Sequence, residues 1–279
     1  MEKDEKMIQL GTEMVVNTGL WKHRLLVGTP VTGLVRIEWV QARYNQIIPT
    51  NWSLVEAMEF MSSSMPLRFQ VSDAENLIVK SAIEKDVEWL LFIEQDNVLP
   101  NNAFIILNKY MREKKVPVVS SVYYTKSVPP EPLVYRGYGN SFFSNWKMGD
   151  KVWADGIPFG CTLIHMSILR EMWNDSPEYT INGKVTRRVF EEPARLVFRP
   201  ELNSYVAETG TSDLNWCKRV IDGKYFEKAG WKKIQKMKYP FLVDTNLFVY
   251  HCDNNGRMFP LQIPRENIPP KNYKPRELK

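Results

Sequence analysis

Two acidic residues, Glu94 and Asp96, stand where a buried strand is expected to end. The run from Trp89 to Ile93 is apolar throughout and too short for a helix of its own, which is typical of a fully buried strand. Glu94 and Asp96 are two residues apart, so we expect both side chains at the sheet edge where open α/β folds bind ligands. Carboxylate oxygens in that place suit Mg²⁺ or Mn²⁺ carrying phosphates. The alternative is that they cap a helix beginning near Pro100.

The composition is that of an ordinary globular protein. Of 279 residues, 44% are hydrophobic and 25% are charged, which leaves little room for long disordered segments. The net charge of +5 favours anionic ligands only weakly, because a nucleic-acid-binding protein normally carries a denser stripe of Lys and Arg. We expect one large α/β domain rather than two small ones.

The cysteines and the apolar runs bear on where the protein works. The three cysteines are Cys161, Cys217 and Cys252, and their odd number and wide separation argue against a disulfide framework. No run approaches the roughly 20 apolar residues of a membrane span, and no apolar signal core follows the charged N-terminus. These features predict a cytoplasmic protein with reduced thiols and no transmembrane segment.

Strand and helix patterns alternate along the first half of the chain. The expected strands cover 24–30, 53–61, 88–93 and 116–124, and the expected helices cover 35–48, 72–83 and 103–113, with a loop at 62–66. Ser72 with Glu75 three residues later is a capping-box pattern, which predicts a helix start. The alternation predicts a parallel, doubly wound sheet. No GxGxxG or Walker A pattern follows the first strand, which argues against classical dinucleotide and P-loop proteins.

The second half of the chain is less regular. Residues 126–151 are rich in Pro, Gly and aromatic side chains, which suit the apolar face of a sugar ring, although loops packed by their own aromatics look the same. Gly156 and Gly160 precede an apolar strand and let backbone come close to a ligand or to another strand. In that strand, His165 is expected to be an ordinary satisfied histidine. Residues 176–206 form an irregular charged insertion, for which a mobile lid is one option.

The last elements carry three further polar residues of interest. A helix is expected over about 213–221, with Thr211 or Ser212 as its cap, and Asp213 would complement the helix dipole at its start. A closing strand over 241–250 leads to His251, and a Pro- and Lys-rich tail follows Asn254.

In this order, the residues resemble GT-A-fold glycosyltransferases, most closely family 2-like members. The resemblance covers about 24–253 and is carried by Asn76 in a helix start, the strand ending in Glu94-Gln95-Asp96, strand 118–124, loop 156–161, Thr211-Ser212-Asp213, and 244–251. It implies a Rossmann-like, mostly parallel sheet flanked by helices in a single domain over 23–253. Its nucleotide-binding half would be 24–125 and its acceptor-binding half 126–253, with an N-terminal extension over 1–22 and a tail over 254–279.

The resemblance also implies an activity, namely transfer of a sugar from a nucleotide-sugar donor, here expected to be a UDP-sugar, with Mn²⁺ or Mg²⁺. The acceptor would be a hydroxyl group of a glycan, protein, lipid or modified nucleic acid. Asp96 corresponds to the metal-holding acid of the Asp-x-Asp motif, His251 to a late histidine ligand, and Asp213 to the general base of inverting members. The chain departs from the family pattern at Glu94, which replaces the first Asp of the motif, and at Ser212-Asp213, where Glu-Asp is common; Glu208 is the alternative base.

The candidate contacts can be grouped by the ligand that each would meet. The expected donor contacts are Thr29, Pro30, Asp73, Asn76, Glu94, Gln95, Asp96, Gly156 and Gly160, and the expected acceptor contacts are Tyr123, Tyr124 and Trp146. A divalent cation would stabilise the negative charge of the leaving nucleoside diphosphate, and a carboxylate would activate the acceptor hydroxyl. Two other classes stay open: a sugar-nucleotide pyrophosphorylase, although the first strand lacks a Gly-rich loop with a basic residue, and a non-catalytic nucleotide- or carbohydrate-binding module.

Overall fold

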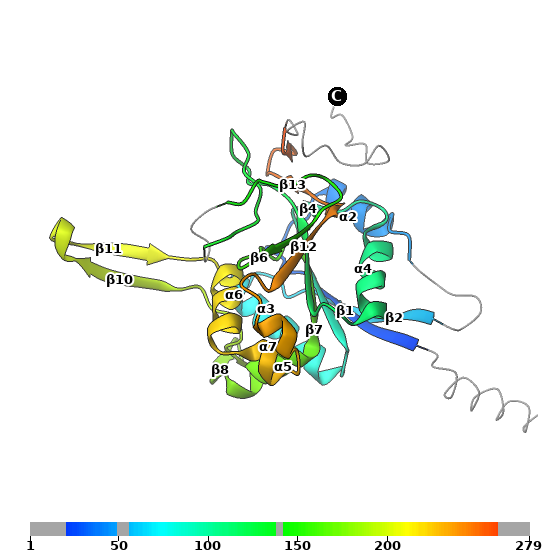
Figure 1. Cartoon of the computed structure of the whole chain (residues 1–279), viewed down its shortest axis with the longest axis horizontal. Helices are drawn as coiled ribbons and strands as arrows, with labels where there is room; N and C mark the ends of the chain where they lie inside the picture. Colours follow the sequence, from blue (N-terminus) through cyan, green and yellow to red (C-terminus); the bar gives the residue numbers. More distant parts are fainter. Residues whose placement is uncertain (1–20, 49–55, 138–141, 262–279) are drawn as a thin grey trace, which may run out of the picture.

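A computed structural model describes residues 21–48, 56–137 and 142–261, and its centre is a seven-stranded sheet with the order β2-β1-β3-β7-β5-β12-β6 (Figure 1). The strands are β1 (Trp21–Gly28), β2 (Glu56–Ser64), β3 (Trp89–Ile93), β5 (Val118–Val122), β6 (Lys151–Ala154), β7 (Cys161–His165) and β12 (Phe241–Phe248). The pairings orient β2, β1, β3, β5 and β12 in one direction and β7 and β6 in the other. The expected mostly parallel α/β sheet is therefore confirmed.

A fully parallel order is wrong at two strands. β7 lies between β3 and β5 and is antiparallel to both, and β6 closes the sheet antiparallel to β12. Both reversed strands come after β5 in the chain: β6 lies within the long segment 123–160 that leaves the carboxyl end of β5, and β7 follows that segment directly. An apolar run such as 161–165 predicts burial but carries no information about strand direction.

Helices cover both faces of the sheet. They are α2 (Ile37–Tyr44), α3 (Val71–Glu84), α4 (Ala103–Glu113), α5 (Met166–Asp175), α6 (Ser212–Asp222) and the short α7 (Tyr225–Lys228) and α8 (Lys232–Gln235). α4 packs Phe104, Leu107 and Met111 on one face, and α3, α5 and α6 form a second core on the other. None of the helices in these described ranges is long and apolar enough to cross a membrane.

Three local expectations between 53 and 75 are corrected by the structure. The strand was expected over 53–61 and a loop over 62–66, but β2 continues through Ser64 because Ser62 to Ser64 pair in parallel with the end of β1; 53–55 lie outside the described residues. The helix begins at Val71 with Gln70 as N-cap, so Ser72 and Glu75 do not form a capping box. Both are buried instead.

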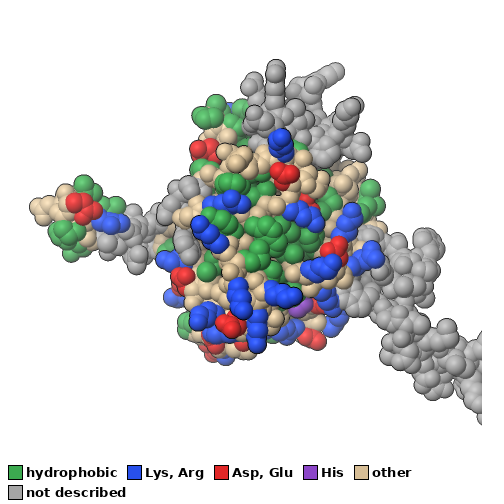
Figure 2. Space-filling model, in the orientation of Figure 1, with side chains coloured by type: hydrophobic (Ala, Val, Ile, Leu, Met, Phe, Trp, Pro, Cys, Tyr) green, Lys and Arg blue, Asp and Glu red, His purple; other side chains and the backbone are tan. Residues whose placement is uncertain are grey.

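The segment 176–206 is regular, contrary to expectation. It contains one hairpin of β8 (Glu178–Ile181) and β9 (Lys184–Arg187) and most of a second, formed by β10 (Ala194–Arg199), a 3₁₀ turn (Pro200–Leu202) and β11 (Ser204–Thr209). The second hairpin projects from the body as an arm (Figures 1 and 2). In the first hairpin the strands are mostly exposed or half-buried, so the sequence carries no clear apolar alternation there.

A small three-stranded sheet joins the segments that follow the central strands β3 and β12. β13 (Tyr250–Cys252) pairs with β4 (Asn97–Val98), which follows β3, and with β14 (Met258–Phe259). The expected tail therefore takes part in the fold as far as β14, while 262–279 lie outside the described residues, as do 1–20 of the expected N-terminal extension. The three cysteines are buried and form no disulfide, as the sequence predicted.

Candidate metal and donor site

The end of β3 and the start of β13 bring three potential metal ligands together. One ligand atom each from Glu94, Asp96 and His251 lies within 4.8 Å of the others. The β13–β4 pairing holds them, because His251 is directly opposite Asn97 and the Cys252 amide donates to the Asp96 carbonyl at 2.7 Å. The sequence separated Asp96 and His251 by most of the domain, and the fold places them side by side.

His251 is oriented by a backbone carbonyl. Its Nδ1 lies 2.9 Å from the Tyr124 oxygen, and since a carbonyl can only accept, Nδ1 carries the hydrogen. This leaves Nε2 directed at Asp96, 3.4 Å from Oδ2. A neutral ring thus presents a lone pair where a cation would bind, and a protonated ring donates to the carboxylate.

The pKa values of Asp96 and Glu94 are shifted in opposite directions. Burial raises the pKa of Asp96, but His251 and the ammonium of Lys126 outweigh it and bring the pKa to about 2. Burial, together with the charges of Asp96 and Asp213, raises the pKa of Glu94 to about 8. Asn97 Nδ2 donates to both carboxylates, at 3.1 Å to Asp96 and 3.2 Å to Glu94.

The donor set fits a divalent cation. Two carboxylates suit Mg²⁺ and Mn²⁺, and the imidazole nitrogen adds a ligand that Mn²⁺ accepts more readily than Mg²⁺. Asn97 Oδ1 is buried at the same place and makes no hydrogen bond. An unsatisfied buried oxygen beside two carboxylates is consistent with a site that gains a partner when a ligand binds.

The loop after β1 lies at the same edge of the sheet. Gln95 ties it to the acidic loop, because its Oε1 accepts from the Thr32 amide at 2.8 Å and its Nε2 donates to Thr32 Oγ1 at 2.7 Å. Thr29 is buried, with its amide bonded to Ser64 O, and Pro30 is partly buried. The structure therefore brings the 29–33 loop to the acidic loop, as the donor assignment requires.

Gly160 belongs to the acidic cluster through its backbone. Its carbonyl accepts from the Glu94 amide at 3.0 Å, and its amide donates to the Tyr123 hydroxyl at 2.9 Å. A Cβ at this position would come within 2.7 Å of Asn97 Oδ1 and closer still to the Tyr123 ring. The glycine is required for this close approach. A Cβ at Gly156 would instead meet Leu214 and Tyr135 side chains.

Asp73 and Asn76, which were expected to contact the donor, attach the insertion in this structure. Asn76 Nδ2 donates to Phe190 O at 2.9 Å and to the Tyr179 hydroxyl at 3.0 Å, and its Oδ1 accepts from the Phe190 amide at 2.8 Å. The Tyr179 hydroxyl donates to Asp73 Oδ1 at 2.7 Å. The polar start of α3 therefore faces β8 and the chain after β9, and the Asn76 amide has its hydrogen bonds filled by protein.

The three aromatic residues assigned to the acceptor are buried, so their ring faces are not open to a sugar in this structure. Tyr124 and Trp146 are 1% and 5% exposed and belong to the core beneath α3 and α6. Tyr123 packs in the core beneath α4. These three aromatic residues are thus part of the core, which is the second of the two interpretations that the composition left open.

Asp213 opens α6 close enough to the cluster for its charge to act on Glu94. Its Oδ1 accepts from the Leu214 amide at 2.7 Å, and Thr211 is the N-cap residue. Burial raises the pKa of Asp213, whereas the helix dipole alone would lower it. Glu208, the alternative base, lies on the arm opposite Arg195 in the β10–β11 pairing, and its side chain is outside the described part.

Two charged residues of the site were missed by sequence reasoning. Glu75 is buried against α6, where Ser212 hydrogen-bonds to it, and burial raises its pKa well above the usual value; its second oxygen has no partner. Lys126 contacts Asp96. In the sequence, Glu75 resembles a capping residue, and Lys126 lies in a loop whose path a sequence does not reveal. Neither residue therefore carried a pattern that would predict a place in the site. His165, as expected, is satisfied locally, since its ring accepts from the Ser167 amide.

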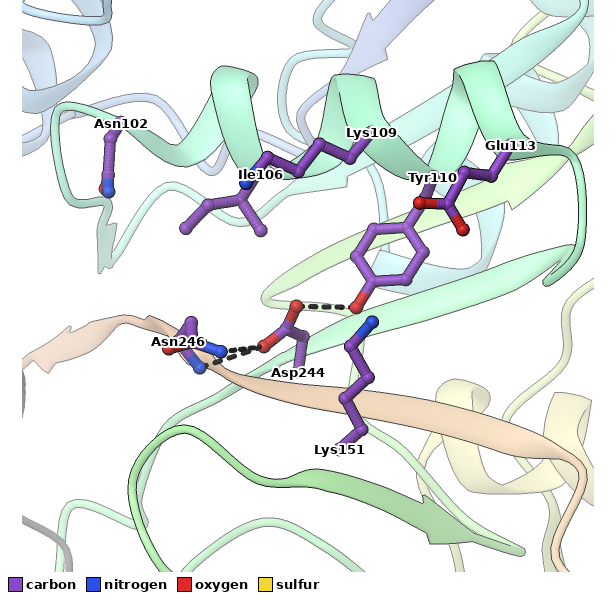
Figure 3. A pocket seen from close by; sticks show the side chains of 8 residues that line it. All are labelled: Asn102, Ile106, Lys109, Tyr110, Glu113, Lys151, Asp244 and Asn246. Atoms are coloured by element: carbon purple, nitrogen blue, oxygen red, sulfur yellow. Dashed lines mark hydrogen bonds between the residues drawn. The ribbon is translucent and has the colours of Figure 1, made fainter.

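A separate cavity of about 360 Å³ lies between α4 and the β12–β6 edge of the sheet (Figure 3). Asp244 forms its floor, with Oδ2 accepting from the Tyr110 hydroxyl at 2.5 Å and Oδ1 from the Asn246 amide at 3.0 Å. The remaining lining residues are Asn102, Ile106, Lys109, Glu113 and Lys151. The cavity contains none of the predicted site residues, and its carboxylate is satisfied within the protein.

Comparison with known proteins gives only distant likenesses. No family model and no curated protein matches the chain. The crystal structure of A197 from STIV is similar with a TM-score of 0.46 and 15% identity, over 84% of this chain and 92% of that one. S. aureus TarS 1–349 in complex with UDP has a TM-score of 0.34 and 11% identity, over 55% of this chain and 50% of that one. Its complex with UDP-GlcNAc has a TM-score of 0.31 and 12% identity, over 55% and 48%. These values do not assign the chain to a family.

Proposed function

We propose that the protein is a metal-dependent glycosyltransferase that moves a sugar from a nucleotide-sugar donor to an acceptor hydroxyl. The observation that carries the proposal is the convergence of Glu94, Asp96 and His251 at the carboxyl end of the central strand β3. Ligands of open α/β sheets bind at this edge, and carboxylates with an imidazole suit a cation that carries a diphosphate. The first-strand loop, joined to it through Gln95, supplies the neighbouring surface for the nucleotide.

Asp96 and His251 are the residues that would hold Mn²⁺ or Mg²⁺, with Glu94 as a third ligand or a contact to the donor. When bound, the cation supplies charge stabilisation for the leaving nucleoside diphosphate. Glu94 must be ionised to ligate, and its raised pKa means that it gives up a proton when it does so. Asp96 is already ionised at neutral pH, which makes it the anchoring ligand.

Asp213 is the group that would accept the acceptor's proton. In a single displacement the acceptor oxygen forms the new bond to the anomeric carbon, the bond to the diphosphate oxygen breaks, and the hydroxyl proton passes to the Asp213 carboxylate. Its raised pKa makes it a stronger base than an exposed aspartate while it is still ionised. This mechanism inverts the anomeric configuration.

The test is a donor panel. Purified protein is incubated with UDP-, GDP-, CMP- and dTDP-sugars with and without Mn²⁺, and thermal unfolding and slow donor hydrolysis are measured. We expect one donor, in the first place a UDP-sugar, to raise the unfolding temperature only with the cation. Asp96→Ala should abolish this shift while unfolding as cooperatively as the wild type, and His251→Ala should weaken it.

The matched control is Asp253→Ala. Asp253 lies two residues after His251 and pairs with Arg257 rather than with the cluster. Donor binding that does not change with the cation or in Asp96→Ala would contradict the proposed metal site. Release of pyrophosphate from a nucleoside triphosphate would indicate a pyrophosphorylase, and binding without turnover of any donor and acceptor a non-catalytic module.

A further inference from the structure

The ammonium group of Lys126 lies against the Asp96 carboxylate, which is the group proposed to bind the metal. Its Nζ forms an ion pair with Asp96 Oδ2, the same oxygen that faces His251 Nε2 at 3.4 Å. The two side chains of the ion pair are 31% and 32% exposed, so neither is locked in the core. An ammonium group therefore stands at the edge of the ligand cluster.

The ion pair competes with a bound divalent cation. An ammonium group and a divalent cation at the same carboxylate oxygen repel each other, and this repulsion is strong in a partly desolvated site. The backbone around Lys126 is held by the Thr125 amide bond to Glu131 O at 2.9 Å and by the Leu133 amide bond to Tyr123 O at 2.9 Å. Displacement of the ammonium is thus a movement of the Lys126 side chain, for which a long, flexible stem is suited.

We propose that Lys126 is a counter-ion that occupies Asp96 in the metal-free protein and moves to the donor diphosphate when a divalent cation binds. The proposal rests on the proposed function. A diphosphate next to the cation offers Lys126 a new anionic partner at the same edge of the sheet. The cation displaces Lys126 from Asp96, and the freed ammonium then forms an ion pair with the diphosphate. Cation and donor therefore strengthen each other's binding.

Ordinary surface ion pairs do not have this consequence. Lys115 and Glu113, 3.8 Å apart with side chains 78% and 54% exposed, form such a pair at the end of α4. Neither residue belongs to the ligand cluster, and pairs of this kind contribute little to stability. Lys115→Met is therefore a control with the same change of charge, distant from any proposed ligand atom.

The first measurement is the affinity for Mn²⁺ alone, by calorimetry at fixed ionic strength and without nucleotide. Lys126→Met removes the competing ammonium and should bind Mn²⁺ roughly two- to fivefold more tightly than the wild type, which matches the usual contribution of a partly exposed ion pair. Lys115→Met should bind Mn²⁺ like the wild type. Thermal unfolding of each variant checks that the fold is intact.

The second measurement is the coupling between Mn²⁺ and a nucleoside diphosphate, with UDP and GDP as probes. Saturating Mn²⁺ should increase the nucleotide affinity of the wild type more than that of Lys126→Met. Only the wild type has an ammonium that can move from Asp96 to the diphosphate. Equal Mn²⁺ affinity in the wild type and Lys126→Met would overturn the proposal while leaving an Asp96-dependent metal site in place. Absence of Mn²⁺ binding in both proteins would overturn it together with the proposed metal site.

Discussion

Glu94 and Asp96 show how local partners decide the charge of chemically similar residues. They are two positions apart on one strand end, yet the pKa of one is raised to about 8 and that of the other is lowered to about 2. His251 and Lys126 both contact Asp96, whereas for Glu94 burial and the charges of Asp96 and Asp213 outweigh the attraction of Lys126. Separation of this kind is typical of functional sites, where one acid carries charge and its neighbour carries a proton.

Asp213 is the residue for which the chemical and structural interpretations diverge most clearly. Asp213→Asn keeps the shape and the side-chain oxygen that accepts from the Leu214 amide, but it cannot accept a proton. We expect donor and Mn²⁺ affinity to be retained and turnover to fall by roughly a hundredfold to ten-thousandfold, the usual contribution of a positioned base. Initial rates of transfer and calorimetric donor titrations measure the two quantities.

A near-normal rate in Asp213→Asn would remove the base assignment. A retaining mechanism, or Glu208 as base, would then have to be tested. Stability of the variant is the internal control, because a residue that only opens a helix should affect unfolding and rate equally little when replaced by Asn.

At the scale of elements, the start of α3 is an attachment point. Asn76, Asp73 and Lys80 on this helix bond to Phe190, Tyr179 and Val185 of the insertion. The resulting contact holds the β8–β9 hairpin on the same side of the sheet as α6, whose first turn carries Asp213. The insertion is thus part of the frame that positions the candidate base rather than a detached lid.

Asn76→Ala tests this attachment. It removes the paired hydrogen bonds to the Phe190 backbone and leaves that buried amide and carbonyl without partners, so we expect unfolding to become easier by about 2–4 kcal/mol. Urea unfolding gives the free energy, and hydrogen exchange of 178–190 should show the loss locally. Lys80→Ala, which removes an exposed bond to Val185 O, should cost less than about 1 kcal/mol. Equal effects of the two changes would contradict the proposed importance of the buried clamp.

For the whole molecule, the burial of Glu75 couples stability to pH. Its pKa is raised well above 4.5 in the folded protein, so the unfolded chain releases this proton first as pH rises. The stability associated with the neutral form is complete below pH 4.5 and is lost as pH rises from there toward the folded pKa. The loss amounts to at most ~1.4 kcal/mol per pH unit.

Glu75→Gln removes this dependence. We expect the variant and the wild type to unfold at similar urea concentrations at pH 4 and the variant to be more stable at pH 8, because glutamine cannot ionise. Glu84→Gln, on an exposed position of the same helix, is the control and should follow the wild type at both pH values. A constant difference between Glu75→Gln and the wild type across this range would contradict a neutral buried acid.

The sequence by itself determined the elements that have a strong apolar pattern. The central strand, α4 and the acidic strand end were predicted with nearly correct limits, because burial on both faces or on one stripe leaves a clear period in the residues. The pattern also indicated the class of the sheet and the carboxylates at its edge. These features depend on neighbours in the chain, which a single sequence displays directly.

Only the tertiary structure decided the direction of β7 and β6, the partners of Asn76 and the composition of the acidic cluster. Strand direction depends on the path of a connection, and Asn76 could be assigned to the insertion only once α3 and Phe190 were placed together. Lys126 and His251 meet at Asp96 because they follow the parallel strands β5 and β12, which end at the same edge of the sheet, although 125 residues separate them in the chain. Charge states follow from such long-range neighbours, since a pKa responds to distance in space and not to position in the sequence.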